Sequence, residues 1–324
     1  MQLLIRELRD RLGSSPRRAI AVLAAGSVLL VGCSAPAPTA LRADGDAPVA
    51  LATLQPGSVK TVPPTTARTA AKPPATSSAP SPTHSTAHPS PSSTAPKRVA
   101  VPKVTAAQLR ALPVADTYAR LRHAGIDVHA EPTGQLAHIA RDTVAFRAPG
   151  GTPVAMIPHE EVGVATWLPV LAVRPGWLEV RLPSRPNGVV AWVPAPGIPT
   201  KSTSYRIVVS LHAGVMTIYR GRHVVGGWIV GHGRPGLPTP TARTFVMTRF
   251  HDPKQSFSPV IFALGAHSDA MASFEGGPGT IAIHGWPTYA GRHGGVSHGC
   301  VRVPGGALDA LRNVPNGTPV DIKN

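Results

Sequence analysis

The 324-residue chain is long enough for two domains of ordinary size, and its 32 Lys and Arg against 16 Asp and Glu give a formal net charge of +16. Charged residues are only 15% of the chain, so the positive charge reflects scarce acids rather than dense basic clusters, and we expect no nucleic-acid partner. The 37 prolines and 32 glycines argue against a largely helical protein. The two cysteines exclude a disulfide-rich scaffold and any four-cysteine metal site.

Residues 1–32 have the layout of an export signal. Several arginines precede a run of 14 apolar or small residues, Ala19 to Gly32, which is shorter than the ~20 residues needed to span a bilayer. The run ends in Leu30-Val31-Gly32-Cys33, which resembles the lipobox of bacterial lipoproteins. We therefore expect lipid on Cys33, anchoring the chain on the outer face of the cytoplasmic membrane with reach into the cell wall. An ordinary signal peptide or an N-terminal anchor, with Cys33 a chance apolar residue, is the alternative.

Residues 33–104 have the composition of a tether. Between Thr61 and Pro96, 31 of 36 residues are Pro, Ala, Ser or Thr, and no acid occurs from Ala47 to Ala115. Such a segment has too few apolar side chains for their burial to offset the entropy of ordering. We predict a disordered linker here.

The ordered part is expected to begin at Thr105, with a small helical plus SH3-like β region over residues 105–200. Thr105-Ala-Ala-Gln108 is a capping-box pattern that predicts a short helix, and a second helix is expected around 116–124. Residues 177–182 alternate apolar and polar side chains, Asn187-Gly188 is a turn signal, and residues 189–193 read as the returning strand. This hairpin resembles a bacterial SH3-like module. A packing or positioning role is expected for the region, with ligand binding as the alternative.

Residues 201–324 are expected to form a second domain that is mainly β. Because strands dominate and helices are few, the pattern favours a β-sandwich or partly closed barrel with one or two short helices over alternating strand–helix winding. The predicted strands are 205–211, 215–219, 223–230, 244–249, 281–283 and 319–322, with a loop over 231–240 and a short helix around 307–314.

A thiol and an imidazole mark the candidate chemistry. If Cys33 carries lipid, Cys300 is the one free thiol, and a lone thiol outside the cell is a liability unless its reactivity is used. With an ordinary pKa near 8.5, only about 3% of a thiol is ionised at pH 7, so a nucleophilic cysteine needs a base within hydrogen-bond reach. His284 ends a predicted strand sixteen residues upstream. Gly299 has no side chain to stop its N–H from approaching a reacting carbonyl.

The segment Ser297-His-Gly-Cys-Val-Arg302, with His284-Gly285 after an apolar strand, resembles the signature of the L,D-transpeptidase catalytic domain, the YkuD-like family. Further similar segments at 238–240, 265–281 and 317–322 extend the resemblance over about residues 205–322. It implies a YkuD-like β fold for this part of the chain.

The resemblance also implies a role for each matching position. Cys300 would be the nucleophile and His284 its general base, oriented by the backbone carbonyl of Gly285. The amides of Gly299 and Cys300, with His298, would hold the oxyanion. Three further residues would contact substrate: Ser297, Arg302 and Trp286.

The implied reaction is acyl transfer between donor and acceptor stem peptides of peptidoglycan, through a thioacyl enzyme, to give crosslinks between third-position residues. With water as acceptor the same site would be an L,D-carboxypeptidase, and a catalytically inactive peptidoglycan-binding lipoprotein is the non-enzymatic alternative. Carbapenem-type β-lactams are implied inhibitors, and no metal or organic cofactor is called for.

Two other site types fit these residues less well. Gly295-Val-Ser-His-Gly299 has the form of a hydrolase nucleophile elbow, but the strand–helix background and a later triad histidine are missing. A metal site made of His284, His293, His298 and Cys300 matches no known zinc spacing.

Overall fold

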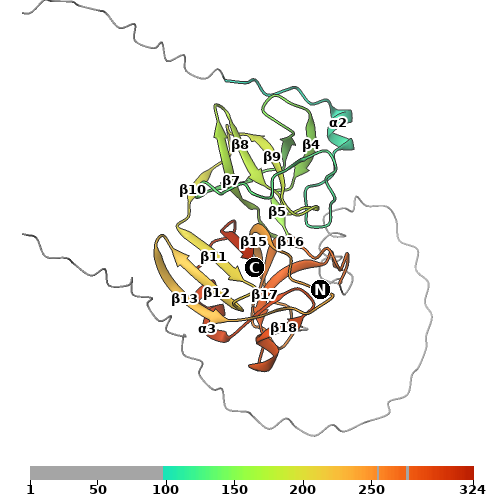
Figure 1. Cartoon of the computed structure of the whole chain (residues 1–324). Coiled ribbons are helices and arrows are strands. Elements are labelled where there is room, and N and C mark those ends of the chain that lie inside the picture. Colours follow the sequence, from blue (N-terminus) through green and yellow to red (C-terminus); the bar gives the residue numbers. More distant parts are fainter. Residues whose placement is uncertain (1–97, 254, 275–276) are drawn as a thin grey trace, which may run out of the picture. The chain divides into compact units, whose positions relative to one another are not determined.

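The computed structural model describes residues 98–324 except 254 and 275–276, and these residues lie in one compact unit (Figure 1). The export signal, Cys33 and the tether up to residue 97 lie outside the described residues, so those expectations stay predictions. Within the described part of the chain, no helix has the length and apolar character needed to cross a bilayer.

Residues 98–202, called here the N-terminal β region, form an antiparallel sheet in the order β10-β2-β7-β8-β9-β3-β4, with β1 also paired to β9. The strand bounds are β1 (Gly125–Ile126), β2 (Gln135–His138), β3 (Thr143–Phe146), β4 (Pro153–Ile157), β7 (Trp167–Arg174), β8 (Trp177–Arg181), β9 (Val189–Pro194) and β10 (Thr200–Ser202), and β5 (Glu160–Glu161) pairs with β6 (Val164–Ala165). The predicted hairpin is confirmed as β8 and β9. Its turn uses Gly188 at φ +89°, a conformation that favours glycine.

One of the two predicted helices of this region is present. Helix α2 (Ala106–Ala111) begins at Thr105, whose hydroxyl accepts from the Gln108 N–H while the Gln108 side chain accepts from the Thr105 N–H, which confirms the capping box. The helix expected around 116–124 is wrong. The Asp116 carboxylate accepts the N–H groups of Tyr118 and Ala119, which closes a turn, and Leu121 then donates to the Arg185 carbonyl.

Residues 204–324, called the C-terminal β region, form a ten-stranded mixed sheet in the order β13-β12-β11-β20-β15-β16-β17-β19-β14-β18. The bounds are β11 (Tyr205–Ser210), β12 (Val215–Arg220), β13 (His223–Ile229), β14 (Gly231–Gly233), β15 (Ala242–Phe250), β16 (Ile261–His267), β17 (Thr280–Gly285), β18 (Gly294–Ser297), β19 (Val301–Val303) and β20 (Pro319–Lys323), with the short helices η1 (Ala290–Arg292) and α3 (Gly305–Leu311). The mainly β fold and all six predicted strands are confirmed.

Four strands of this sheet were not predicted. Strand β16 is buried along its whole length, so it lacks the alternation that marks a half-exposed strand. Strand β14 lies in the expected 231–240 loop, and its Gly-His-Gly sequence has low strand propensity. Strands β18 and β19 flank the Ser-His-Gly-Cys segment and are only four and three residues long. These strands depend on their partners in the sheet more than on their own sequence.

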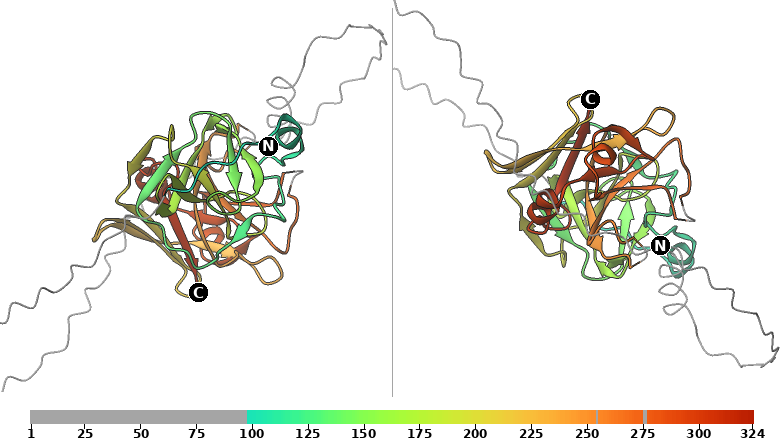
Figure 2. Two further views of the ribbon diagram at one scale, coloured as in Figure 1. Left: turned by 90° about the horizontal axis from the view of Figure 1, so that it is seen from above. Right: turned by 90° about the horizontal axis from the view of Figure 1, so that it is seen from below.

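The two β regions share buried side chains. One hydrophobic cluster lies wholly in the C-terminal β region, between Ile207 and Ile322. A second cluster joins Phe245, Met247 and Ala263 to side chains of the N-terminal β region such as Val180. In both views of Figure 2 the green strands of the first region overlap the yellow and orange strands of the second, and the contact between them includes β7 and β15. Since burying one Phe side chain is worth about 2–3 kcal/mol, the shared cluster couples the stability of the two regions.

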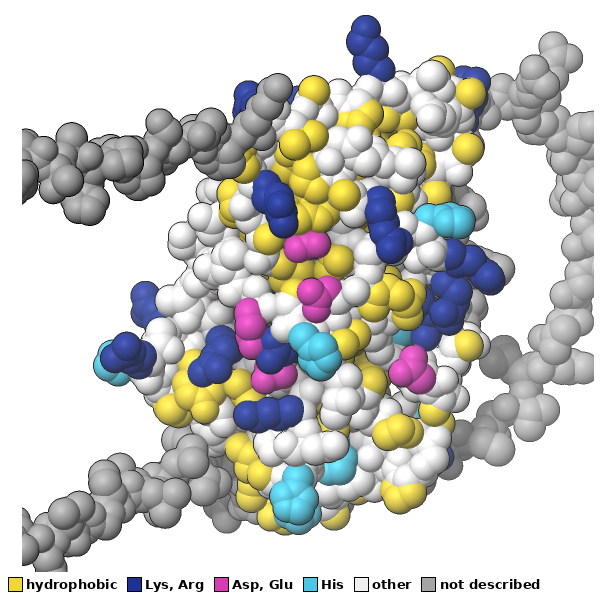
Figure 3. Space-filling model, turned by 45° about the horizontal axis from the view of Figure 1, so that its top comes forward, with side chains coloured by type: hydrophobic (Ala, Val, Ile, Leu, Met, Phe, Trp, Pro, Cys, Tyr) yellow, Lys and Arg dark blue, Asp and Glu magenta, His cyan; other side chains and the backbone are white. Residues whose placement is uncertain are grey.

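Charged side chains of both signs are present on the surface. On the face drawn in Figure 3, Lys and Arg side chains are spread over the surface, with few Asp and Glu between them, and do not form one dense basic patch.

Candidate active site

The parallel pairing of β17 with β19 brings the thiol and the imidazole to one place. His284 lies opposite Arg302, and Ile283 opposite Val301. Paired residues of parallel strands project from the same face, and residues two apart on a strand share that face. His284, Arg302 and Cys300 therefore project from one face of the sheet, and all three line a cavity of ≈ 490 Å³.

The cavity also contains the other predicted site side chains. Trp286, Ser297 and His298 line it, so every side chain with a predicted role belongs to one cavity. The lining also includes the apolar side chains of Met271 and Phe274. A cavity of this size, lined by both apolar and polar side chains, has the character of a ligand site.

The imidazole of His284 is held in one tautomer. Its Nδ1 lies 2.9 Å from the Gly285 carbonyl oxygen, which can only accept, so Nδ1 carries the hydrogen and Nε2 is the basic nitrogen. The side chain is 8% exposed, and burial lowers its pKa; the Gly285 carbonyl opposes this, and the Arg302 charge adds to it. His284 is therefore neutral at pH 7 and can accept a proton at Nε2.

Cys300 is half-buried and precedes β19 directly. Burial raises the pKa of its thiol, whereas a backbone hydrogen bond from Ala282 and the positive charge of Arg302 act in the opposite direction. The resting pair is thus a neutral thiol beside a neutral imidazole. A base is needed to form the thiolate, because the surroundings do not ionise the sulfur on their own.

The turn between β18 and β19 is shaped by Ser297. Its hydroxyl donates to the Cys300 carbonyl at 2.6 Å and accepts the Gly299 N–H at 3.0 Å. Gly299 has φ +119°, where side chains are strained, so the glycine is needed for the path of the turn. Ser297 is 1% exposed and holds the turn, and the substrate contact expected for it stays a prediction. The Gly299 amide is engaged by Ser297, so the oxyanion role expected for it requires this hydrogen bond to open.

A second hydroxyl supports the same turn. Thr239 donates to the Gly299 carbonyl at 2.7 Å and accepts the Gly233 N–H from β14 at 2.8 Å. Its signal in the sequence is the Pro238-Thr-Pro240 segment, to which no role was assigned. Ser258 similarly accepts the Gly285 N–H at 2.7 Å while donating to the Val260 carbonyl. No sequence pattern marks Ser258.

Arg302 braces the loop over the site. Its guanidinium lies 3.5 Å from the centre of the Trp286 ring, and Nη1 donates to the carbonyls of Gly291 and Val296. The guanidinium that is expected to contact substrate thus already has partners within the protein. Phe257, which the sequence did not single out, lies between His284 and Trp286, with ring centroids at 5.4 and 4.9 Å. His298 is exposed, with its ring 5.8 Å from that of Phe274.

Comparison with known proteins finds a similarity in the C-terminal β region. Residues 204–322 match the family model of the YkuD L,D-transpeptidase catalytic domain. A search of curated protein sequences gives no significant match.

Several solved L,D-transpeptidases are similar to this chain. An Enterococcus faecium L,D-transpeptidase is 20% identical over 37% of this chain and 49% of its own, with a TM-score of 0.29. L,D-transpeptidase 1 of Mycobacterium tuberculosis is 20% identical over 42% of this chain and 78% of its own, with a TM-score of 0.28. L,D-transpeptidase 3 of the same organism, solved with a faropenem-derived adduct, is 16% identical over 43% and 75%, with a TM-score of 0.32. The chain spans about half the length of the Enterococcus protein.

Proposed function

We propose that this chain is a peptidoglycan L,D-transpeptidase that works through a thioacyl enzyme on Cys300. The observation that carries the proposal is the β17–β19 register, which puts the Cys300 thiol and the His284 imidazole on one face of one cavity, within the segment that matches the catalytic-domain family. The imidazole tautomer supports it, because Nε2 is the nitrogen left without a hydrogen.

In the first half-reaction, His284 Nε2 takes the proton of the Cys300 thiol, and the thiolate attacks the carbonyl of the third residue of a donor stem. The C–N bond to the terminal D-amino acid breaks, the departing amine receives the proton from His284, and a thioester remains on Cys300. In the second half-reaction, an acceptor amine attacks the thioester and gives its proton to His284. The sulfur leaves and regains a proton, and a crosslinked peptide is released.

The oxyanion formed in each step needs donors. The Cys300 amide is the donor next to the reacting sulfur, and the Gly299 amide joins it if the bond to Ser297 opens as the carbonyl becomes an oxyanion. His298, exposed at the rim of the cavity, is positioned to contribute from the side chain.

The cellular setting is part of the proposal. Lipid on Cys33 would hold the chain on the outer face of the cytoplasmic membrane, and residues 33–104 would let the folded part reach the wall. Replacing Cys33 by Ala is expected to release the protein from the membrane fraction. Carbapenem-type β-lactams are expected to acylate Cys300, because their strained carbonyl meets the same nucleophile.

The test uses the full chain carrying Cys33→Ala, in which Cys300 is the one remaining thiol. Intact mass after exposure to a tetrapeptide stem is expected to show an added tripeptide acyl group, and addition of an acceptor stem is expected to give a crosslinked product. A free tripeptide without crosslink would establish the carboxypeptidase. Absence of any adduct or product would overturn the proposed mechanism and favour an inactive wall-binding protein. Full turnover by Cys300→Ala would overturn it by showing that another group is the nucleophile.

A further inference from the structure

One wall of the candidate active-site cavity is made by the segment that follows β16. Its described residues are 268–274 and 277–279, and Ser268, Met271, Phe274 and Gly279 line the cavity. The Ser268 N–H donates to the Gly279 carbonyl at 2.9 Å, which brings the two ends of the segment together. We call these described residues the cavity wall. Phe274 of the wall lies against His298, so its position sets the width of the cavity beside Cys300.

The cavity wall is held by a residue of the other β region. Arg185, in the connection between β8 and β9, donates from Nη1 to the Ser268 carbonyl at 3.0 Å and from Nη2 to the Pro278 carbonyl at 2.7 Å. Nη2 also lies 3.4 Å from the Ala272 carbonyl. One guanidinium thus contacts both ends and the middle of the wall. The planar fork of arginine suits this, since its several donors point in fixed directions.

Arg185 itself is fixed by its backbone. Its N–H donates to the Ala119 carbonyl and its carbonyl accepts from Leu121, at 2.8 and 2.9 Å. Two residues on, the Asn187 side chain pairs with the backbone of His267, donating to its carbonyl and accepting its N–H, both at 2.9 Å. His267 is the last residue of β16, so the hairpin connection is attached directly in front of the cavity wall.

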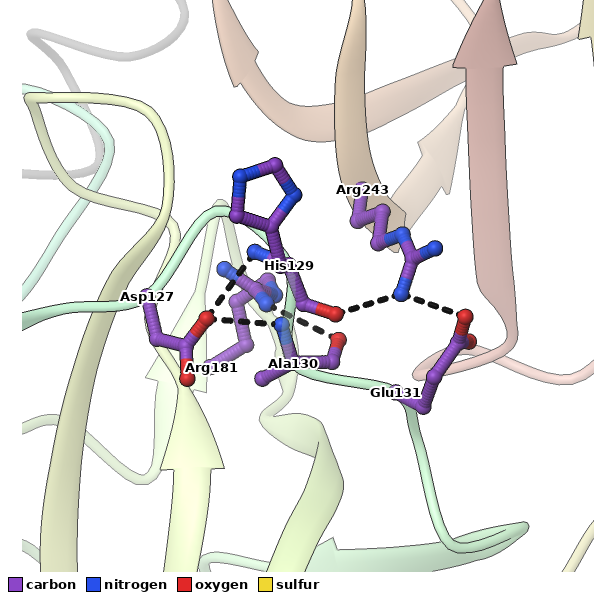
Figure 4. Close-up of polar contacts among 6 residues, drawn as sticks. All are labelled: Asp127, His129, Ala130, Glu131, Arg181 and Arg243. Carbon is purple, nitrogen blue, oxygen red and sulfur yellow. Dashed lines mark hydrogen bonds and ion pairs between the residues drawn. The ribbon is translucent and has the colours of Figure 1, made fainter.

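A second set of contacts joins the two β regions. Figure 4 shows Arg243 of β15 donating to the His129 carbonyl and pairing with Glu131 of the N-terminal β region. Asp127 accepts the N–H groups of His129 and Ala130, which holds this loop in place for Arg243. With the shared hydrophobic cluster, these contacts make the N-terminal β region a fixed support for Arg185.

We propose that Arg185 is a positioning residue for the substrate cavity: through it, the N-terminal β region sets the place of the cavity wall against which the donor stem peptide lies. The identity of the ligand rests on the proposed function. The hydrogen bonds from Arg185 to the cavity wall do not depend on it. It gives residues 105–200 a part in the active site, although none of their side chains lines the cavity.

The test compares Arg185→Ala with Arg120→Ala in the chain carrying Cys33→Ala. Arg120 is an exposed arginine whose charge acts on Arg185, so its removal matches the charge change without removing donors to the wall. Arg185→Ala is expected to raise KM for the donor stem about tenfold, as loss of ~1.4 kcal/mol of binding would, with kcat changed less than about twofold. Arg120→Ala is expected to leave both constants near the starting values. Arg185→Lys, which keeps the charge but not the fork, is expected to lie between the two.

Two readouts separate this brace from general stability and from the proposed function. The pH profile of Cys300 alkylation by iodoacetamide is expected to be the same in all three variants, because the thiol and His284 do not contact Arg185. Amide hydrogen exchange in residues 268–274 is expected to be faster in Arg185→Ala alone, and this holds even if no stem peptide acylates the enzyme. Equal exchange in the Arg185 and Arg120 variants, or an unchanged KM, would overturn the inference. So would a loss of kcat in both Arg185 variants together with an alkylation pH profile of Cys300 like that of the unfolded chain, since that is the mark of global unfolding.

Discussion

His284 lies directly opposite Arg302 in the parallel pair β17–β19, so one permanent cation acts on both titratable groups of the candidate site. The positive charge favours the thiolate of Cys300 and disfavours the imidazolium of His284, which lowers the pKa of each. Arg302 therefore helps the nucleophile and keeps the base unprotonated, in addition to bracing Trp286.

Arg302→Gln is expected to raise both pKa values. Removal of the cation destabilises the thiolate, so the rate of Cys300 alkylation should begin to rise at a higher pH than in the starting protein. His284 should gain a proton at a higher pH as well, because the repulsion of its imidazolium is gone. Alkylation measured across pH and the ring resonances of His284 report the two shifts. Arg302→Lys keeps a charge, and a shift as large in this variant would show that the stack on Trp286, not the charge, is responsible.

The hydroxyl of Thr239 is expected to be needed for stability and for the nucleophile turn. Thr239→Val leaves the Gly233 N–H and the Gly299 carbonyl without partners in a buried place, at a cost of about 1–3 kcal/mol per group. Urea unfolding should show the loss, and acylation of Cys300 by a carbapenem should be slower. Thr241→Val, the same change at an exposed position two residues away, is the matched control. Equal unfolding midpoints for the two variants would contradict the prediction.

A buried polar group between the two β regions is expected to give stability a pH dependence. Glu161 accepts the Thr117 N–H, and burial raises the pKa of its carboxyl to about 8 from 4.5. Thr117 in turn contacts His267, where burial lowers the pKa to about 4 from 6.5. Both groups are thus neutral in the folded chain at pH 7.

The signs of the two contributions differ. Between pH 4.5 and 8 the folded chain keeps a proton on Glu161 that the unfolded chain releases, so this contribution falls as the pH rises. Between pH 4 and 6.5 the unfolded chain protonates His267 and the folded chain does not, so that contribution rises with pH. The two cancel from pH 4.5 to 6.5, and Glu161 alone acts from 6.5 to 8, by at most ~1.4 kcal/mol per pH unit.

Glu161→Gln is therefore expected to flatten the fall in stability between pH 6.5 and 8, because the amide keeps an acceptor for Thr117 and cannot ionise. Urea midpoints at the two pH values measure the effect. Asp309→Asn, at an exposed position of α3, is the control and should leave the slope as it was. A slope unchanged by Glu161→Gln would place the pH dependence elsewhere.

The features that could be predicted from the sequence are those formed by residues close together in the chain. The capping box at Thr105 and the β8–β9 hairpin depend on hydrogen bonds and turn geometry within a few residues, so they could be predicted. The same holds for the candidate nucleophile and base, because Ser297 to Arg302 is one contiguous segment and His284 ends a clear apolar strand.

Where a residue's hydrogen-bond partner is distant in the sequence, only the tertiary structure shows the contact. The 116–124 segment looks helical by composition, but its backbone bonds with Arg185, which no local pattern reveals. Thr239 reaches Gly299 across sixty residues, and Arg185 reaches Ser268 across eighty-three. The side chain of a residue determines which hydrogen bonds it can form. The order of the strands in the sheet determines which partner lies within reach. The amino-acid sequence thus specified which atoms can react, and the fold specified which atoms hold them in place.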